Sequence, residues 1–146
     1  MRILFFLLSI FYIASIFVLA GSPVVETLSE FNPYSLLHIP LYGIMTLLMV
    51  FSMVPIRRGS KDGSIQSGSD LTRPRSQGPV DLKLRLLLTG GIAWFVGIFD
   101  EVHQLYVPGR DGSISDVVLD MVGITITLLL CFWFFKTRVF NHPDKA

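Results

Sequence analysis

Four long apolar segments dominate the sequence and leave few folds open to it. They cover residues 3–20, 36–56, 84–105 and 114–135. A helix that crosses the hydrocarbon core of a membrane needs about 20 mainly apolar residues, and each segment comes close to or exceeds that length. Strands are improbable because the segments show no alternation of apolar and polar residues, and because lipid does not tolerate an open sheet edge. The sequence therefore predicts an all-α integral membrane bundle of four transmembrane helices, forming a single domain over residues 1–146.

The composition supports this fold and excludes several soluble classes. Hydrophobic residues make up 51% of the chain and charged residues 16%, compared with about 25% charged residues in a typical soluble domain. The net charge of +1 provides no broad basic surface, so we expect no nucleic-acid partner. The single cysteine, Cys131, excludes an intramolecular disulfide and a metal site built from several cysteines.

The positions of lysine and arginine predict the orientation in the membrane. Basic residues precede the first span, follow the fourth, and are frequent between the second and third, whereas the outer loops contain only Arg110. Because basic loops are retained in the cytoplasm, both termini are predicted to be cytoplasmic. Residues 57–81 are rich in Ser, Gly, Asp and Arg and have almost nothing apolar to bury, which predicts a flexible cytoplasmic loop.

The first apolar segment has a second interpretation. Arg2 followed by an apolar run and Val18-Leu19-Ala20 also fits a secretory signal with a cleavage site. The run is longer than an ordinary signal segment and its leading charge is weak, so a retained first span is the preferred prediction.

Polar residues recur near the outer end of three predicted spans. Counted at about 1.5 Å per residue from the basic end, they lie roughly 22–30 Å up their helices. Each span carries two polar residues four positions apart, which therefore share a helix face: His38 and Tyr42, Asp100 and Gln104, and Asp116 and Asp120. We call these six residues together with Glu101 the polar layer. Small residues follow on the same faces, so we expect the layer to point into the bundle.

The loop between the third and fourth spans is a predicted tight turn that carries Arg110. Pro108-Gly109 and Asp111-Gly112 are typical turn formers. The planar guanidinium of Arg110 is suited to a carboxylate or phosphate of a ligand. An internal pair with Glu101, Asp111 or Asp116 is the alternative, and the sequence leaves both open.

We predict no metal site and no cofactor from the sequence. His38, Glu101, His103 and Asp116 have the chemistry to bind a divalent ion, but no His-Glu-x-x-His motif or comparable spacing supports one.

Two stretches of the sequence resemble the VanZ-like family. The first is LHIPLY at residues 37–42, and the second is DEVHQLYVPGRDGSISD at residues 100–116, followed by Gly123. The four-span layout resembles the family over nearly the whole chain. The resemblance implies a multi-pass protein of the bacterial cytoplasmic membrane, in a family known for a member that confers resistance to the glycopeptide teicoplanin.

Two positions depart from the family pattern. The family often has a lysine three residues before the histidine and an asparagine four residues after the loop aspartate, where this chain has Ser35 and Asp120. The site is therefore more negative than the pattern, which argues against a simple transfer of the drug-resistance role.

Three functions remain open from the sequence. The site would bind or protect an envelope ligand at the outer face, with membrane lipid, an envelope precursor or a glycopeptide-related molecule as partners. Alternatively, it would be an enzyme acting on an envelope lipid or peptidoglycan precursor, or a purely structural lock between helices. Candidate acid–base residues are His38, Asp100 and Glu101. Candidate ligand-binding residues are Tyr42, Gln104, Arg110 and Asp116. The oligomeric state is not predicted.

Overall fold

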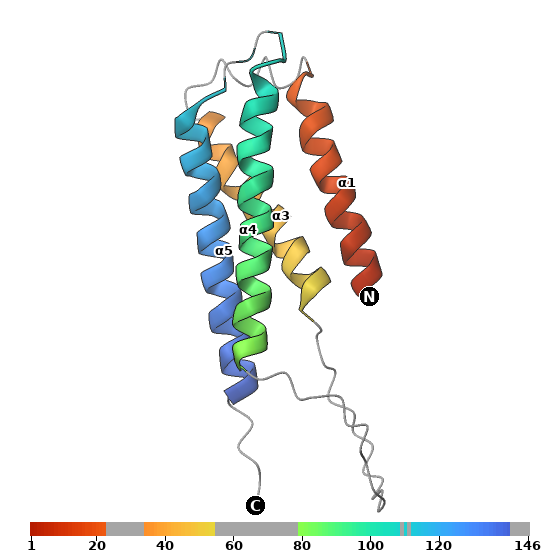
Figure 1. The fold of residues 1–146 in the computed structure, drawn as a ribbon, viewed down its shortest axis with the longest axis vertical. Helices are drawn as coiled ribbons and strands as arrows, with labels where there is room; N and C mark the ends of the chain where they lie inside the picture. Colours follow the sequence, from red (N-terminus) through yellow and green to blue (C-terminus); the bar gives the residue numbers. More distant parts are fainter. Residues whose placement is uncertain (23–33, 55–78, 109, 111, 141–146) are drawn as a thin grey trace, which may run out of the picture.

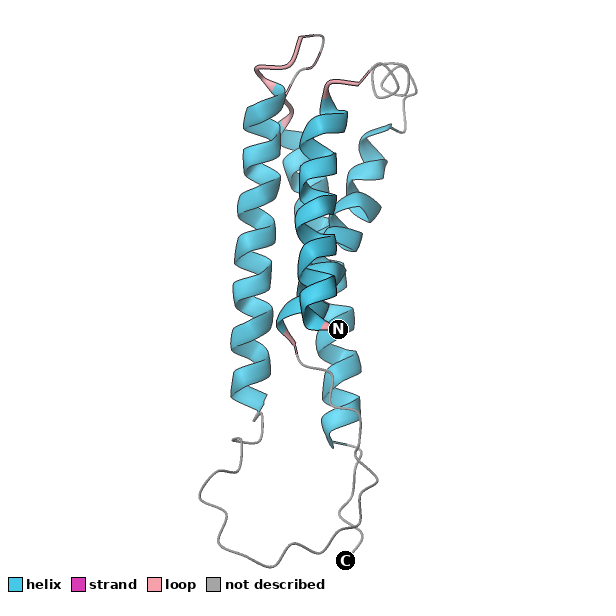
Figure 2. Cartoon of the chain, turned by 90° about the vertical axis from the view of Figure 1, so that its right-hand side faces the viewer, coloured by secondary structure: helices cyan, strands magenta, loops and turns pink. Residues whose placement is uncertain are grey.

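The protein is all-α in the part of the chain that its structure describes. The computed structural model describes residues 1–22, 34–54, 79–108, 110 and 112–140. Helices and short turns make up these residues, with no strand among them (Figure 2). The elements are α1 (Arg2–Ala20), the 3-10 turn η1 (Tyr34–Leu37), α3 (His38–Met53), α4 (Pro79–Gln104) and α5 (Ile114–Phe140). The predicted helical bundle is confirmed.

Three of the helices, α1, α4 and α5, are long and apolar enough to cross a membrane. Helix α4 begins at Pro79 and α5 runs to Phe140, so both extend beyond the predicted spans at the basic end. The predicted cytoplasmic loop at 57–81 is therefore helical from Pro79 onward, and its residues up to 78 lie outside the described part of the chain.

Helix α3 is shorter than the span predicted at 36–56. It has 16 residues, which corresponds to about 24 Å, and a 3-10 turn precedes it. It ends at Met53 because Val54 is extended, with φ −92° and ψ 113°. Pro55 follows in the sequence, and a residue before proline is disfavoured in the helical conformation. The helix therefore ends three residues before the end of the predicted span.

Arginine side chains satisfy carbonyl groups at the end of α3. Arg2 Nε donates to the carbonyl oxygen of Ser52 at 3.2 Å, and Arg85 Nη1 donates to that of Met53 at 2.9 Å. The last carbonyls of a helix lack intrahelical partners, and cations are favourable there. Helices α1 and α4 thereby fix the lower end of α3.

Helix α3 lies at the centre of the bundle and packs against α1, α4 and α5. Figure 1 shows it passing diagonally behind α4, from the top of α5 toward the N-terminus of α1. Its buried residues Tyr42, Met45 and Met49 pack with Ile16 of α1 and Ala93 of α4. The central position of α3 places both of its ends in contact with the other helices.

Gly123 allows α3 and α5 to approach each other closely. A Cβ at this position would overlap the backbone carbonyl of Ile39, and the Cα of Ile39 would lie only 3.0 Å away. Small residues at helix interfaces permit such backbone contact in membranes. Because Ile39 follows His38 directly, this contact also sets the position of His38 against α5.

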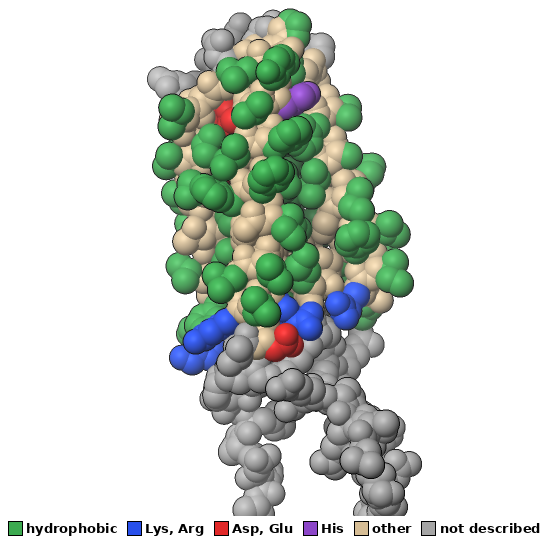
Figure 3. Space-filling view, in the orientation of Figure 1, with side chains coloured by type: hydrophobic (Ala, Val, Ile, Leu, Met, Phe, Trp, Pro, Cys, Tyr) green, Lys and Arg blue, Asp and Glu red, His purple; other side chains and the backbone are tan. Residues whose placement is uncertain are grey.

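The outer surface of the helices is apolar, and the two ends of the bundle differ in their polar residues. Large hydrophobic side chains such as Phe11, Phe95 and Leu129 are exposed on the sides of the bundle, as expected for helices in lipid. Figure 3 shows hydrophobic groups over most of this face and Lys and Arg gathered at the lower end. The polar layer lies toward the opposite end of the bundle.

Candidate functional site

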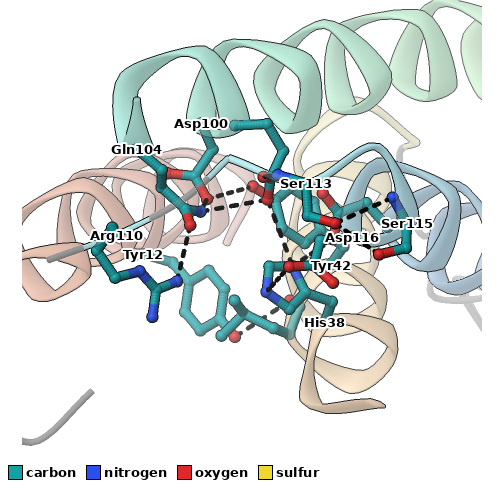
Figure 4. Close-up of polar contacts among 12 residues, drawn as sticks. Tyr12, His38, Tyr42, Asp100, Gln104, Arg110, Ser113, Ser115 and Asp116 are labelled. Carbon is teal, nitrogen blue, oxygen red and sulfur yellow. Dashed lines mark hydrogen bonds and ion pairs between the residues drawn. The ribbon is translucent and has the colours of Figure 1, made fainter. Parts of the chain in front are cut away.

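The polar layer is assembled from three helix ends and one connecting turn. His38 is the first residue of α3, and Tyr42 follows one turn later. Asp100, Glu101 and Gln104 lie in the last turns of α4, and Asp116 and Asp120 lie in the first turns of α5. Figure 4 shows labelled side chains of this group together with Arg110 and Ser113 of the loop. The structure thus brings together all the residues that the sequence singled out for the site.

His38 and Asp120 form the closest pair of ionisable groups in the layer. His38 Nδ1 lies 2.8 Å from Asp120 Oδ1, and both residues are buried. Two more carboxylates face the same imidazole: Glu101 Oε1 is 3.9 Å from Nδ1, and Asp116 Oδ2 is 3.9 Å from Nε2. One histidine therefore lies among three acids contributed by two helices.

A hydrogen-bonded chain links the interior of the layer to Arg110. Tyr42 donates its hydroxyl to Asp100 Oδ2 at 3.1 Å, and Gln104 Nε2 donates to the same oxygen at 3.0 Å. Arg110 Nη2 donates to Gln104 Oε1 at 2.7 Å. Side-chain contacts thus hold half-buried Arg110 against Gln104, beside the buried groups (Figure 4).

Glu101 is oriented by the loop and by its own helix. Ser113 donates its backbone N–H to Glu101 Oε2 at 2.9 Å, and Gln104 Nε2 lies 3.2 Å from Oε1. A Cβ at Gly112 would lie 2.6 Å from the carbonyl oxygen of Glu101, so the loop packs directly on the end of α4. These contacts fix one carboxylate that faces His38.

Asp120 belongs to the polar layer but is not among the site residues predicted from the sequence. The structure makes it the direct partner of His38. The sequence feature that points to Asp120 is its spacing of four residues from Asp116, which places both acids on one face of α5. Which of the two meets His38 depends on how α3 crosses α5, and the spacing alone does not give that crossing.

His103, one of the four residues whose chemistry suits a divalent ion, lies apart from the acids that surround His38. Its ring packs edge-on against Phe17 of α1, with ring centroids 5.3 Å apart. Among the described residues, the group of side chains able to hold an ion is instead His38, Glu101 and Asp120, whose donor atoms lie within 4.8 Å of one another.

The layer concentrates negative charge in a buried position. Asp100 and Asp120 have exposed fractions of 2% and 1%, and Glu101 is also buried. Asp100 Oδ1 and Asp120 Oδ2 are buried without a hydrogen-bond partner in the described structure. Buried carboxylates are costly in a membrane unless they are paired or hydrated. An additional donor or cation would therefore be stabilised at this site.

The comparison with family models decides the relationship of the chain. The VanZ/LLP1 family model matches residues 3–136. The chain belongs to the VanZ/LLP1 family. Neither the curated proteins nor the solved structures contain a significant match. Family membership and the apolar helices together make this VanZ/LLP1 protein a multi-pass membrane protein.

Proposed function

We propose that Arg110, which lies at the outer end of the polar layer in this VanZ/LLP1 protein, binds an anionic group of a cell-envelope ligand at the outer face of the bacterial cytoplasmic membrane. The observation that carries the proposal is the hydrogen-bonded chain from Tyr42 through Asp100 and Gln104 to Arg110. A guanidinium that is fixed in position at the outer end of the layer is suited to contact a phosphate or carboxylate.

The position of Arg110 supports this role. It is the one Lys or Arg at the outer end of the described helices and turns, and it is half-buried. Arg2, Lys83, Arg85 and Lys136 belong to the opposite ends of α1, α4 and α5. An anionic headgroup approaching from the outer leaflet would meet Arg110 first.

An enzyme acting on an envelope lipid or peptidoglycan precursor is the second candidate. The contact of 2.8 Å between His38 Nδ1 and Asp120 Oδ1 favours it, because a carboxylate that orients an imidazole is a common arrangement for a general base. Mass spectrometry of the envelope lipids that co-purify with the protein separates the candidates. An unchanged bound lipid indicates binding, whereas a chemically altered one indicates turnover.

Resistance to teicoplanin is the phenotype through which this proposal is tested. The minimum inhibitory concentration of teicoplanin is measured in a sensitive host, and any rise conferred by the wild-type protein should be abolished by Arg110→Ala. Loss of a charged hydrogen bond costs about 1.5–3 kcal/mol, or about 10- to 150-fold in ligand affinity. Arg110→Lys keeps the charge without the planar donor pair, so we expect a partial rise.

Lys83→Ala is the matched control because Lys83 is an exposed basic residue at the opposite end of the bundle. All variants are compared at equal membrane levels. A rise that survives in Arg110→Ala would contradict the role of Arg110. No rise with the wild-type protein would contradict the link to glycopeptide resistance.

A further inference from the structure

We infer that His38, Glu101 and Asp120 bind a divalent transition-metal ion, with zinc as the ion to be tested. The site lies within the polar layer, but the inference does not depend on the proposed envelope ligand. One imidazole and two carboxylates provide the mixed nitrogen and oxygen ligands that suit zinc, manganese or ferrous iron better than magnesium or calcium.

The distances between the donor atoms are close to those of a coordination shell. Ligands about 2.0–2.2 Å from a tetrahedral ion are roughly 3.3–3.6 Å apart. His38 Nδ1 lies 2.8 Å from Asp120 Oδ1 and 3.9 Å from Glu101 Oε1, on either side of that range. All three donors lie within 4.8 Å of one another. Side-chain adjustments of about 1 Å would complete the shell.

An unpartnered oxygen provides independent support for a ligand at this point. Asp120 is 1% exposed, and its Oδ2 has no hydrogen-bond partner in the described structure. That oxygen lies against Gly97 of α4, 3.3 Å from where a Cβ would be, so no side chain of that residue occupies the space. A buried carboxylate oxygen without a donor is costly. A metal ion bound by both oxygens of the Asp120 carboxylate would give Oδ2 a partner and offset that cost.

The groups around the three ligands have the arrangement of an outer coordination shell. A metal-bound histidine usually presents its other ring nitrogen to a carboxylate or carbonyl. Asp116 Oδ2 faces His38 Nε2 at 3.9 Å, while Nδ1 faces the cluster. Ser113 N and Gln104 Nε2 both contact the Glu101 carboxylate and orient it. Three protein ligands leave a fourth position for water or a ligand oxygen, as in catalytic zinc sites.

Metal content of the purified full-length protein tests the inference. Bound metal is removed from the protein with a chelator in detergent. The protein is then reloaded with zinc and dialysed, and its metal content is measured by elemental mass spectrometry. We expect one zinc ion per chain in the wild type and none in His38→Gln or Asp120→Asn. Asp116→Asn should bind zinc about 10- to 100-fold more weakly, because it changes only the outer shell. His103→Gln, which alters a histidine outside the cluster, should retain one ion.

X-ray absorption spectroscopy of the zinc-loaded wild type identifies the zinc ligands directly, and therefore tests the inference even if a variant fails to fold. The expected spectrum has only nitrogen and oxygen ligands at about 2.0–2.2 Å, with the scattering of a single imidazole. Wild-type protein without zinc, equal zinc in His38→Gln and the wild type, two imidazoles in the spectrum, or displacement of zinc by magnesium would each overturn the inference.

Discussion

Replacing Gly123 with alanine should lower the free energy of unfolding by about 3 kcal/mol, at the upper end of the usual cost of overpacking. The added Cβ would overlap the backbone carbonyl of Ile39, which cannot move aside by rotating a side chain. Helices α3 and α5 would have to separate, and His38 would move away from Asp120. Unfolding in mixed detergent micelles, followed by circular dichroism, measures the effect.

Gly91→Ala is the matched control. Gly91 is an exposed helical glycine, and a Cβ at this position would meet nothing within 4 Å. Alanine is a better helix former than glycine by about 1 kcal/mol, so this variant should be unchanged or slightly more stable. Equal stability of Gly123→Ala and Gly91→Ala would show that α3 and α5 do not approach at Gly123.

His38→Ala should lower the free energy of unfolding of the metal-free protein by about 3–5 kcal/mol. The substitution leaves Glu101, Asp116 and Asp120 buried or half-buried without the imidazole that faces all three. Asp120→Asn should cost much less, because the amide oxygen still accepts a hydrogen bond from His38 and one buried charge is removed.

The double variant tests whether the two residues act on each other directly. In His38→Ala with Asp120→Asn, the removal of one carboxylate should recover about 1–3 kcal/mol of the loss, as expected for residues in contact. The same unfolding measurement is made on all four proteins at neutral pH after chelator treatment. Strictly additive effects would contradict a direct His38–Asp120 interaction.

Most of the fold follows from the apolar segments, and its exceptions have local causes. The long apolar runs are sufficient to predict α1, α4 and α5. Helix α3 is different because Val54 precedes Pro55 and because Arg2 and Arg85 contact its last carbonyls. The proline was visible in the sequence. The arginine contacts were not, since they join residues far apart in the chain.

The composition of the site was more predictable than its internal contacts. Helical spacing and depth were enough to place His38, Tyr42, Asp100 and Gln104 in one layer. The pairing of His38 with Asp120 was not predictable, because it depends on the crossing of α3 over α5, where Gly123 meets Ile39. The position of His103 against Phe17 likewise depends on how α1 packs on α4.

Labelling from outside the cell tests most directly whether the polar layer faces the outer side of the membrane. In a Cys131→Ala background, single cysteines replace Tyr106, which is 82% exposed beside the layer, and Lys83, which is exposed at the basic end. A membrane-impermeant maleimide added to intact spheroplasts should label Tyr106→Cys at once and Lys83→Cys only after permeabilisation. The reverse pattern would place the layer in the cytoplasm and contradict an envelope ligand.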